Sequence, residues 1–169
     1  MAVGVRERKQ EVRNAVIRAL YRVWSTGTDL GEALDIGKDV GATEAEIWPA
    51  LTYLDARGLV KRWGQFNARI TPAGVDMAEE SGLVEEAERG TNGAIRLSLL
   101  RAFWDADATS ERGRPYTSWD EVANATGIDV EQVRRHLDWL EYVGWIDRTG
   151  GRMVVLTADG EDEGDKLFG

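Results

Sequence analysis

The chain has 169 residues, of which 43% are hydrophobic and 30% are charged, with a formal net charge of -9. It has the composition of an ordinary folded protein and no apolar stretch near the roughly 18 residues of a membrane span. We therefore expect no membrane partner, and without an apolar leader at the start we expect a cytoplasmic location. With no cysteine and a single histidine, no metal site and no cofactor are expected.

Positive charge is concentrated at the start of the chain. Residues 1–22 contain six Arg or Lys residues and two Glu residues, whereas residues 76–88 and 159–165 form acidic blocks. Phosphate contacts need clustered cations, so the distribution of charge matters more for nucleic-acid binding than the net value.

The first predicted element is a helix around residues 17–24, where apolar residues recur at three- and four-residue spacing. A capping box of Thr43 and Glu46 begins a later helix. Gly58 is placed for the left-handed end of that helix.

A hairpin is predicted next. Residues 59–63 and 68–71 have the pattern of two strands, and the polar residues 64–67 form the turn. Thr71 and Pro72 then begin a connecting helix, because proline is favoured at the first helical position.

The same order of elements is repeated 86 residues later in the sequence. Residues 47–60 match residues 133–146 without a gap, and the match continues to Gly74 and Gly160. The second copy has six additional residues around positions 109–115, which we interpret as a longer loop. Its second helix is predicted to start at Ser118, where Glu121 completes a capping box, and its third helix at Asp129. The third helix is predicted to end at Gly144, and the hairpin to turn at Gly150 and Gly151.

These elements predict a mainly α protein with small β-hairpin wings (α+β). One domain with its connecting helix covers residues 1–90, and a second covers residues 91–169. The linker is placed at Gly90–Gly93, where glycine and polar residues cluster.

Both copies share a motif at the end of the third helix. It reads Leu-x-x-Leu-x-x-x-Gly, then two apolar residues and a hairpin that closes on Ile-Thr-Pro-Ala-Gly at 70–74 or Leu-Thr-Ala-Asp-Gly at 156–160. In this the chain resembles the winged helix-turn-helix superfamily, and it is similar to prokaryotic regulators of the multiple-antibiotic-resistance and phenolic-acid-decarboxylase types. The resemblance implies two tandem winged helix-turn-helix domains, with the third helix in the DNA major groove and the wing on phosphates.

The resemblance places candidate DNA contacts on both copies. In the second copy, expected to be the main DNA-contacting unit, they are Gln132, Arg134, Arg135, Arg148 and Arg152. The first copy offers Lys61, Arg62 and Arg69. We expect Lys61 and Arg69 to matter less, because Glu44 and Glu46 at the start of that third helix would repel phosphate.

Three positions are aromatic in the first copy and polar in the second, namely Trp48, Trp63 and Phe66. With Pro49 they are predicted to form one apolar patch, which either packs within the chain or serves a homodimer or a protein partner. His136 is interpreted as a half-buried packing residue.

The sequence leaves two classes of function open. The first is a DNA-binding transcriptional regulator that contacts double-stranded DNA. The alternative is a protein-protein interaction module built from tandem winged helices, which does not bind DNA directly; the net negative charge favours it. An enzyme is not expected, because no candidate catalytic residues and no glycine-rich phosphate loop after a strand are present.

Overall fold

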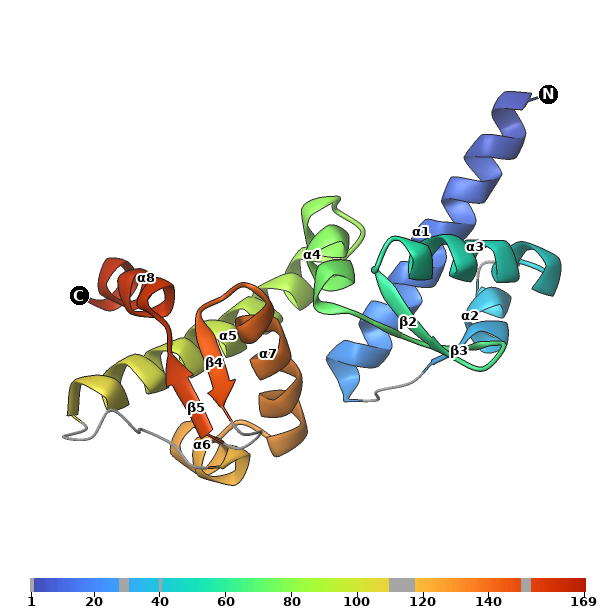
Figure 1. Ribbon diagram of the computed structural model, residues 1–169. Helices are drawn as coiled ribbons and strands as arrows, with labels where there is room; N and C mark the ends of the chain where they lie inside the picture. Colours follow the sequence, from blue (N-terminus) through green and yellow to red (C-terminus); the bar gives the residue numbers. More distant parts are fainter. Residues whose placement is uncertain (1, 28–30, 40, 110–117, 150–152) are drawn as a thin grey trace. The chain divides into compact units, whose positions relative to one another are not determined.

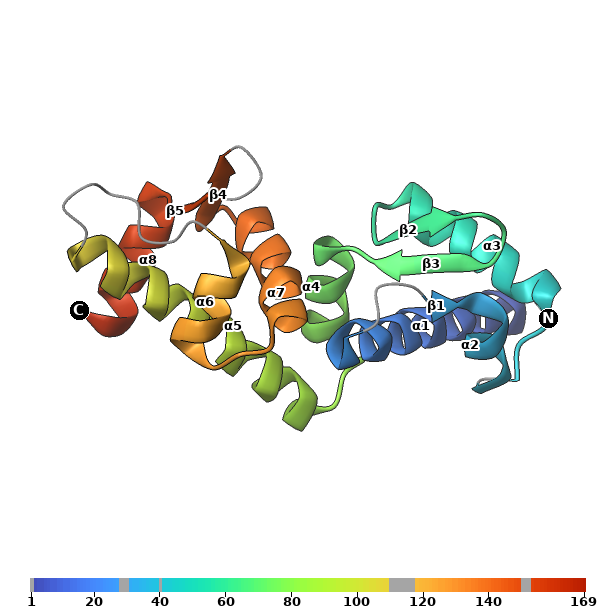
Figure 2. The ribbon, with the colours of Figure 1, turned by 90° about the horizontal axis from the view of Figure 1, so that it is seen from below.

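The computed structural model describes residues 2–27, 31–39, 41–109, 118–149 and 153–169. Within these ranges the chain forms two compact units, Met1–Arg89 and Gly90–Gly169. It is mainly helical with two small antiparallel hairpins (Figures 1 and 2), so the predicted fold class is confirmed. No helix in these ranges has both the length and the apolar character needed to cross a membrane.

The first unit combines three helices, a small sheet and a connecting helix. Its elements are α1 (Ala2–Thr26), β1 (Gly31–Glu32), α2 (Ala33–Asp39), α3 (Glu44–Ala56), β2 (Val60–Trp63), β3 (Asn67–Ile70) and α4 (Pro72–Glu80). The central strand β3 pairs antiparallel with both β1 and β2. Val60, Ala68 and Ile70 are buried, and they lie on the sheet face that packs against α1 and α3.

The second unit repeats this order. Its elements are α5 (Glu86–Thr109), whose first residues precede the unit boundary, α6 (Trp119–Thr126), α7 (Val130–Tyr142), β4 (Ile146–Thr149), β5 (Met153–Leu156) and α8 (Ala158–Phe168). Its sheet has two strands among the described residues, because β4 pairs only with β5 there. Each unit thus has the helices and hairpin of a winged helix-turn-helix domain.

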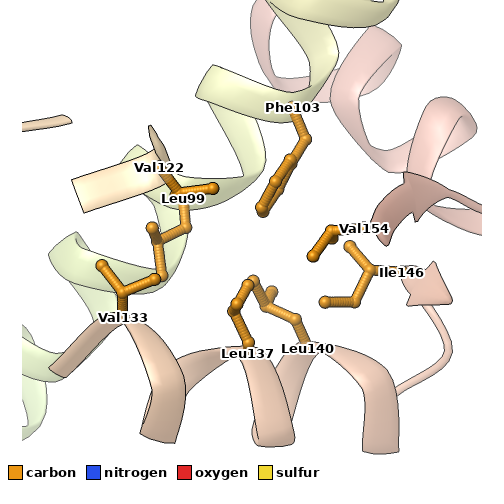
Figure 3. Packing of buried hydrophobic residues seen from close by; sticks show 8 residues of the cluster. All are labelled: Leu99, Phe103, Val122, Val133, Leu137, Leu140, Ile146 and Val154. Atoms are coloured by element: carbon orange, nitrogen blue, oxygen red, sulfur yellow. The ribbon is translucent and has the colours of Figure 1, made fainter. Parts of the chain in front are cut away.

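The core of the second unit joins three helices to the hairpin. Its buried members are Leu99, Phe103, Val122, Val133, Leu137, Leu140, Ile146 and Val154. Figure 3 shows the side chains of α5 and α7 pointing toward one another, with the two hairpin residues at one end of the cluster. Burying each large side chain contributes roughly 1.5–3 kcal/mol. The two leucines of the shared motif are buried in both units, as Leu51 and Leu54 in α3 and as Leu137 and Leu140 in α7.

The same hydrogen bonds connect α3 to α4 and α7 to α8. Thr71 Oγ1 donates to the Gly58 carbonyl and accepts from the Gly74 amide at 3.1 Å. The equivalent threonine of the second unit, Thr157, makes both bonds 86 residues later. Gly58 and its counterpart have φ values of 70° and 84°, the left-handed helix ends that the sequence predicts.

Close packing, rather than an unusual backbone conformation, explains why positions 74 and 160 are glycines. A Cβ atom at Gly74 would lie 2.1 Å from the Leu59 carbonyl oxygen, and one at Gly160 would lie 1.9 Å from that of Trp145. These positions are therefore restricted to glycine, which explains the last residue of the shared motif.

One predicted connection differs in the structure. Gly90–Gly93 is not a loop, because α5 runs through it; the helix breaker is instead Gly82, whose φ is 70°. Strand β1 is two residues long, too short for its alternation to be recognised in the sequence. The predicted long loop at 109–115 lies largely outside the described residues.

Candidate nucleic-acid interface

Helix α7 does not present its arginine pair to solvent. Arg135 is buried, with 4% of its surface exposed, so the prediction that it lies on the DNA-facing surface is wrong. Helical geometry explains this, because successive residues point about 100° apart and cannot share a face. Arg134 is partly exposed but forms an ion pair of 3.1 Å with Glu131.

Gln132 and Arg152 complete the second copy's predicted set. Gln132 is partly buried, and its backbone N–H donates to the Asp129 carboxylate that caps α7. Arg152 lies outside the described residues.

Arg148 is bound by two carboxylates of α7. Its guanidinium donates to Asp138 at 2.7 Å and to Glu141, and only 17% of its side chain is exposed. Burial by itself would lower the pKa of Arg148, but the two acidic partners outweigh it and raise that pKa. The charge that the sequence assigned to phosphate is thus already neutralised within the unit.

Arg62 is the counterpart of Arg148 in the first unit, and its side chain likewise contacts the third helix of its own unit. It donates to Thr52 Oγ1 at 3.1 Å and to the Gln65 carbonyl at 2.9 Å, and it lies over the Trp48 ring at 4.2 Å. Thr52 corresponds to Asp138, so both units connect the first wing strand to the third helix here. Arg62 is a structural contact, and the prediction that it faces DNA is not supported.

The opposite face of the first hairpin is different. We call it the first-wing face; its members are Lys61, Trp63, Asn67 and Arg69, all of them exposed. Lys61 lies directly opposite Arg69, and Trp63 opposite Asn67, so the four side chains share one side of the sheet.

Electrostatics make this face distinctive. Within the described part of the chain, neither Lys61 nor Arg69 forms an ion pair, and like charges directly opposite one another destabilise a strand pair. Both lie near the Trp63 ring, with 5.8 Å from Lys61 Nζ and 4.4 Å from Arg69 Cζ to its centroid. The result is a paired cation site around an indole that is 37% exposed.

The corresponding face of the second hairpin lacks these charges. Register pairs Asp147 with Val155, and Thr149 with Met153. The two cations of the first-wing face are thus replaced by a carboxylate and an aliphatic side chain. The candidate interface therefore includes Lys61 and Arg69, two of the contacts predicted for the first copy, whereas the second copy was expected to be the main DNA-contacting unit.

The start of α3 bears the acidic side chains that the sequence predicted to repel phosphate. Glu46 binds Arg8 at 2.9 Å and accepts from the Thr43 amide at 2.8 Å. The hydrogen bond from Arg8 and then that from Thr43 lower the pKa of Glu46 to about 2. Glu46 therefore stays ionised but paired, while Glu44 is exposed.

The predicted apolar patch is divided by the sheet. Trp48 and Phe66 contact each other edge to face, with centroids 6.3 Å apart, and Pro49 is exposed on the same helix. Trp63 belongs to the opposite face, because side chains alternate along a strand and Arg62 already points toward Trp48. The prediction that all four residues form a single patch is therefore wrong.

No group of three or more acidic or histidine side chains able to hold a metal occurs among the described residues. The single histidine, His136, is buried rather than half-buried. Burial and then the charges of Arg96 and Arg135 lower the pKa of His136 to about 3.

No family model and no curated protein matches the chain. Among solved structures, the chain is similar to the mRNA-binding domain of elongation factor SelB from E. coli in complex with SECIS RNA. The identity is 12% and the TM-score 0.32, over 83% of this chain and 97% of that chain. At this TM-score the likeness indicates neither fold nor function.

Alternation along the strands is the signal that could have found the first-wing face in the sequence. With Val60 in the core, Arg62 must face inward, while Lys61 and Trp63 face outward. The opposition of Lys61 and Arg69 depends on the register, which the turn length sets.

Proposed function

We propose that the protein binds nucleic acid, in particular double-stranded DNA, through the first-wing face. The observation that carries the proposal is the pair of cations Lys61 and Arg69, held opposite each other without an acidic partner in the described part of the chain. An anionic ligand would relieve their repulsion, and the phosphate backbone supplies anions in a regular array.

Trp63 supports the same assignment. Its exposed indole provides an apolar surface beside the two cations, of the kind that packs against sugars and base edges in a groove. In the finer form of this proposal the bound protein regulates transcription, as the resemblance to prokaryotic regulators implies.

Fluorescence anisotropy with a labelled duplex of mixed sequence at low salt tests the proposal. Wild type is expected to bind, and the double variant Lys61→Ala, Arg69→Ala to lose most of that affinity. The matched control is Arg134→Ala, which also removes a positive charge but from the second unit; it should bind as wild type does. Equal binding by all three proteins, or none by wild type, would contradict the proposal.

A second candidate function is a protein-interaction module. It is favoured by the second unit, where residues 90–169 carry nine cations against fifteen carboxylates and Arg148 is already paired. That unit is poorly suited to phosphate, so in this second candidate function it contacts a protein partner.

A further inference from the structure

A groove lies between the N-terminal half of α1 and the start of α3, away from the first-wing face. It has a volume of about 410 Å³, within the range of sites that hold a ligand. Val5, Val12, Pro49 and Ala50 give it apolar lining. Val5 is 58% exposed, so it adds apolar surface at the edge of the groove.

The α1 side of this groove is positively charged. Arg8, Lys9 and Arg13 line it from α1, and Glu46 is the carboxylate among its lining residues. Arg8 and Glu46 neutralise each other through their ion pair. Two positive charges are therefore left beside the apolar surface.

These two charges have a defined geometry. Lys9 and Arg13 are one helical turn apart, and the Arg13 guanidinium is held 3.5 Å from the centroid of the Tyr53 ring. The part of α1 that lines the groove, residues 4–13, is about 14 Å long. Carboxylates four residues apart on another helix have the matching spacing.

We propose that the α1–α3 groove binds an amphipathic helix of a partner protein, with carboxylates spaced by one turn along one edge of its apolar face. The apolar side chains of that helix cover Val5 and Pro49, and its carboxylates pair with Lys9 and Arg13. A second copy of this chain fits less well, because a two-fold interface places the same positive stripe of α1 against itself.

The probe is a labelled helical peptide with leucines at three- and four-residue spacing and glutamates one turn apart along one edge. Its control has the same composition in an order that scatters the leucines. Binding to the full chain is followed by anisotropy, with the mass in solution measured in parallel. The fold of each variant is checked by circular dichroism and thermal unfolding.

Two protein variants and one matched control give the readout. Val5→Ser should weaken binding about tenfold through lost apolar contact, and Lys9→Gln up to about fivefold through one lost ion pair. Gln10→Glu also lowers the net charge by one, but Gln10 does not line the groove; it should bind as wild type does.

Three results would overturn the proposal. The first is no binding of the ordered peptide, and the second is equal binding of the ordered and scattered peptides or of the Lys9→Gln and Gln10→Glu variants. The third is a wild-type dimer that Val5→Ser converts to a monomer, which would make a second copy the occupant.

Discussion

The salt dependence of DNA binding distinguishes the first-wing face from the arginines of the second unit. Each neutralised phosphate contributes about -0.9 to the slope of log affinity against log salt. Two contacts, by Lys61 and Arg69, give a slope of about -1.8, or roughly a twelvefold loss between about 50 and 200 mM salt. Four contacts by the second unit would give about -3.6, or roughly a 150-fold loss.

Anisotropy titrations at several salt concentrations measure this slope. Lys61→Ala and Arg69→Ala should each flatten it by about 0.9, and Arg134→Ala should leave it unchanged. A wild-type slope near -3.6 that Arg134→Ala flattens would refute the reasoning, because the charge of the second unit would then be available to phosphate despite its acidic partners.

The remaining predictions concern stability and are measured by denaturant or thermal unfolding. Lys61→Glu should stabilise the fold by roughly 0.2–1 kcal/mol, since it replaces a like-charge pair with an opposite one, and it should weaken DNA binding; a less stable variant would contradict the repulsion. Gly74→Ala should destabilise by about 1–3 kcal/mol through its clash with the Leu59 carbonyl. Gly90→Ala should stabilise the fold by about 1 kcal/mol, because α5 is continuous at this position and the added Cβ meets no atom within 4 Å. The pKa of His136 is lowered to about 3 in the folded protein. As the pH falls below the ordinary pKa of histidine, the unfolded chain therefore binds a proton at this residue before the folded chain does. The free energy of unfolding should therefore fall toward acid, by about 2 kcal/mol between pH 7 and pH 5. His136→Gln should lack this pH-dependent loss. Equal pH dependence of wild type and variant would exclude His136 as its source.

Local signals in the sequence were sufficient for most elements of the fold. The threonine caps, the left-handed glycines and the period of the apolar residues act within one or two turns, and a match between two copies made them easier to recognise. Strand β1 was missed because two residues cannot show a period. The continuity of α5 was missed because glycine and polar residues at 90–93 were interpreted as a linker, although tertiary packing overrides such preferences.

The candidate site was harder to predict because it depends on which way a side chain points. Arg62 and Lys61 are neighbours of the same charge, yet the first contacts α3 and the second faces solvent. Arg148 was assigned to phosphate by its place on the wing, but Asp138 and Glu141 on a separate element neutralise it. Such pairings depend on tertiary structure, and the sequence repeat does not reveal them.

The most direct test of the account is to map the DNA-contacting residues by NMR. A titration of the labelled protein with short duplex DNA follows the backbone amides and the Trp63 indole N–H. We expect the largest shifts at Trp63 and at the amides of Lys61, Asn67 and Arg69, with the second unit little changed. Shifts concentrated on α7 and the β4–β5 hairpin instead would contradict the assignment of DNA binding to the first-wing face.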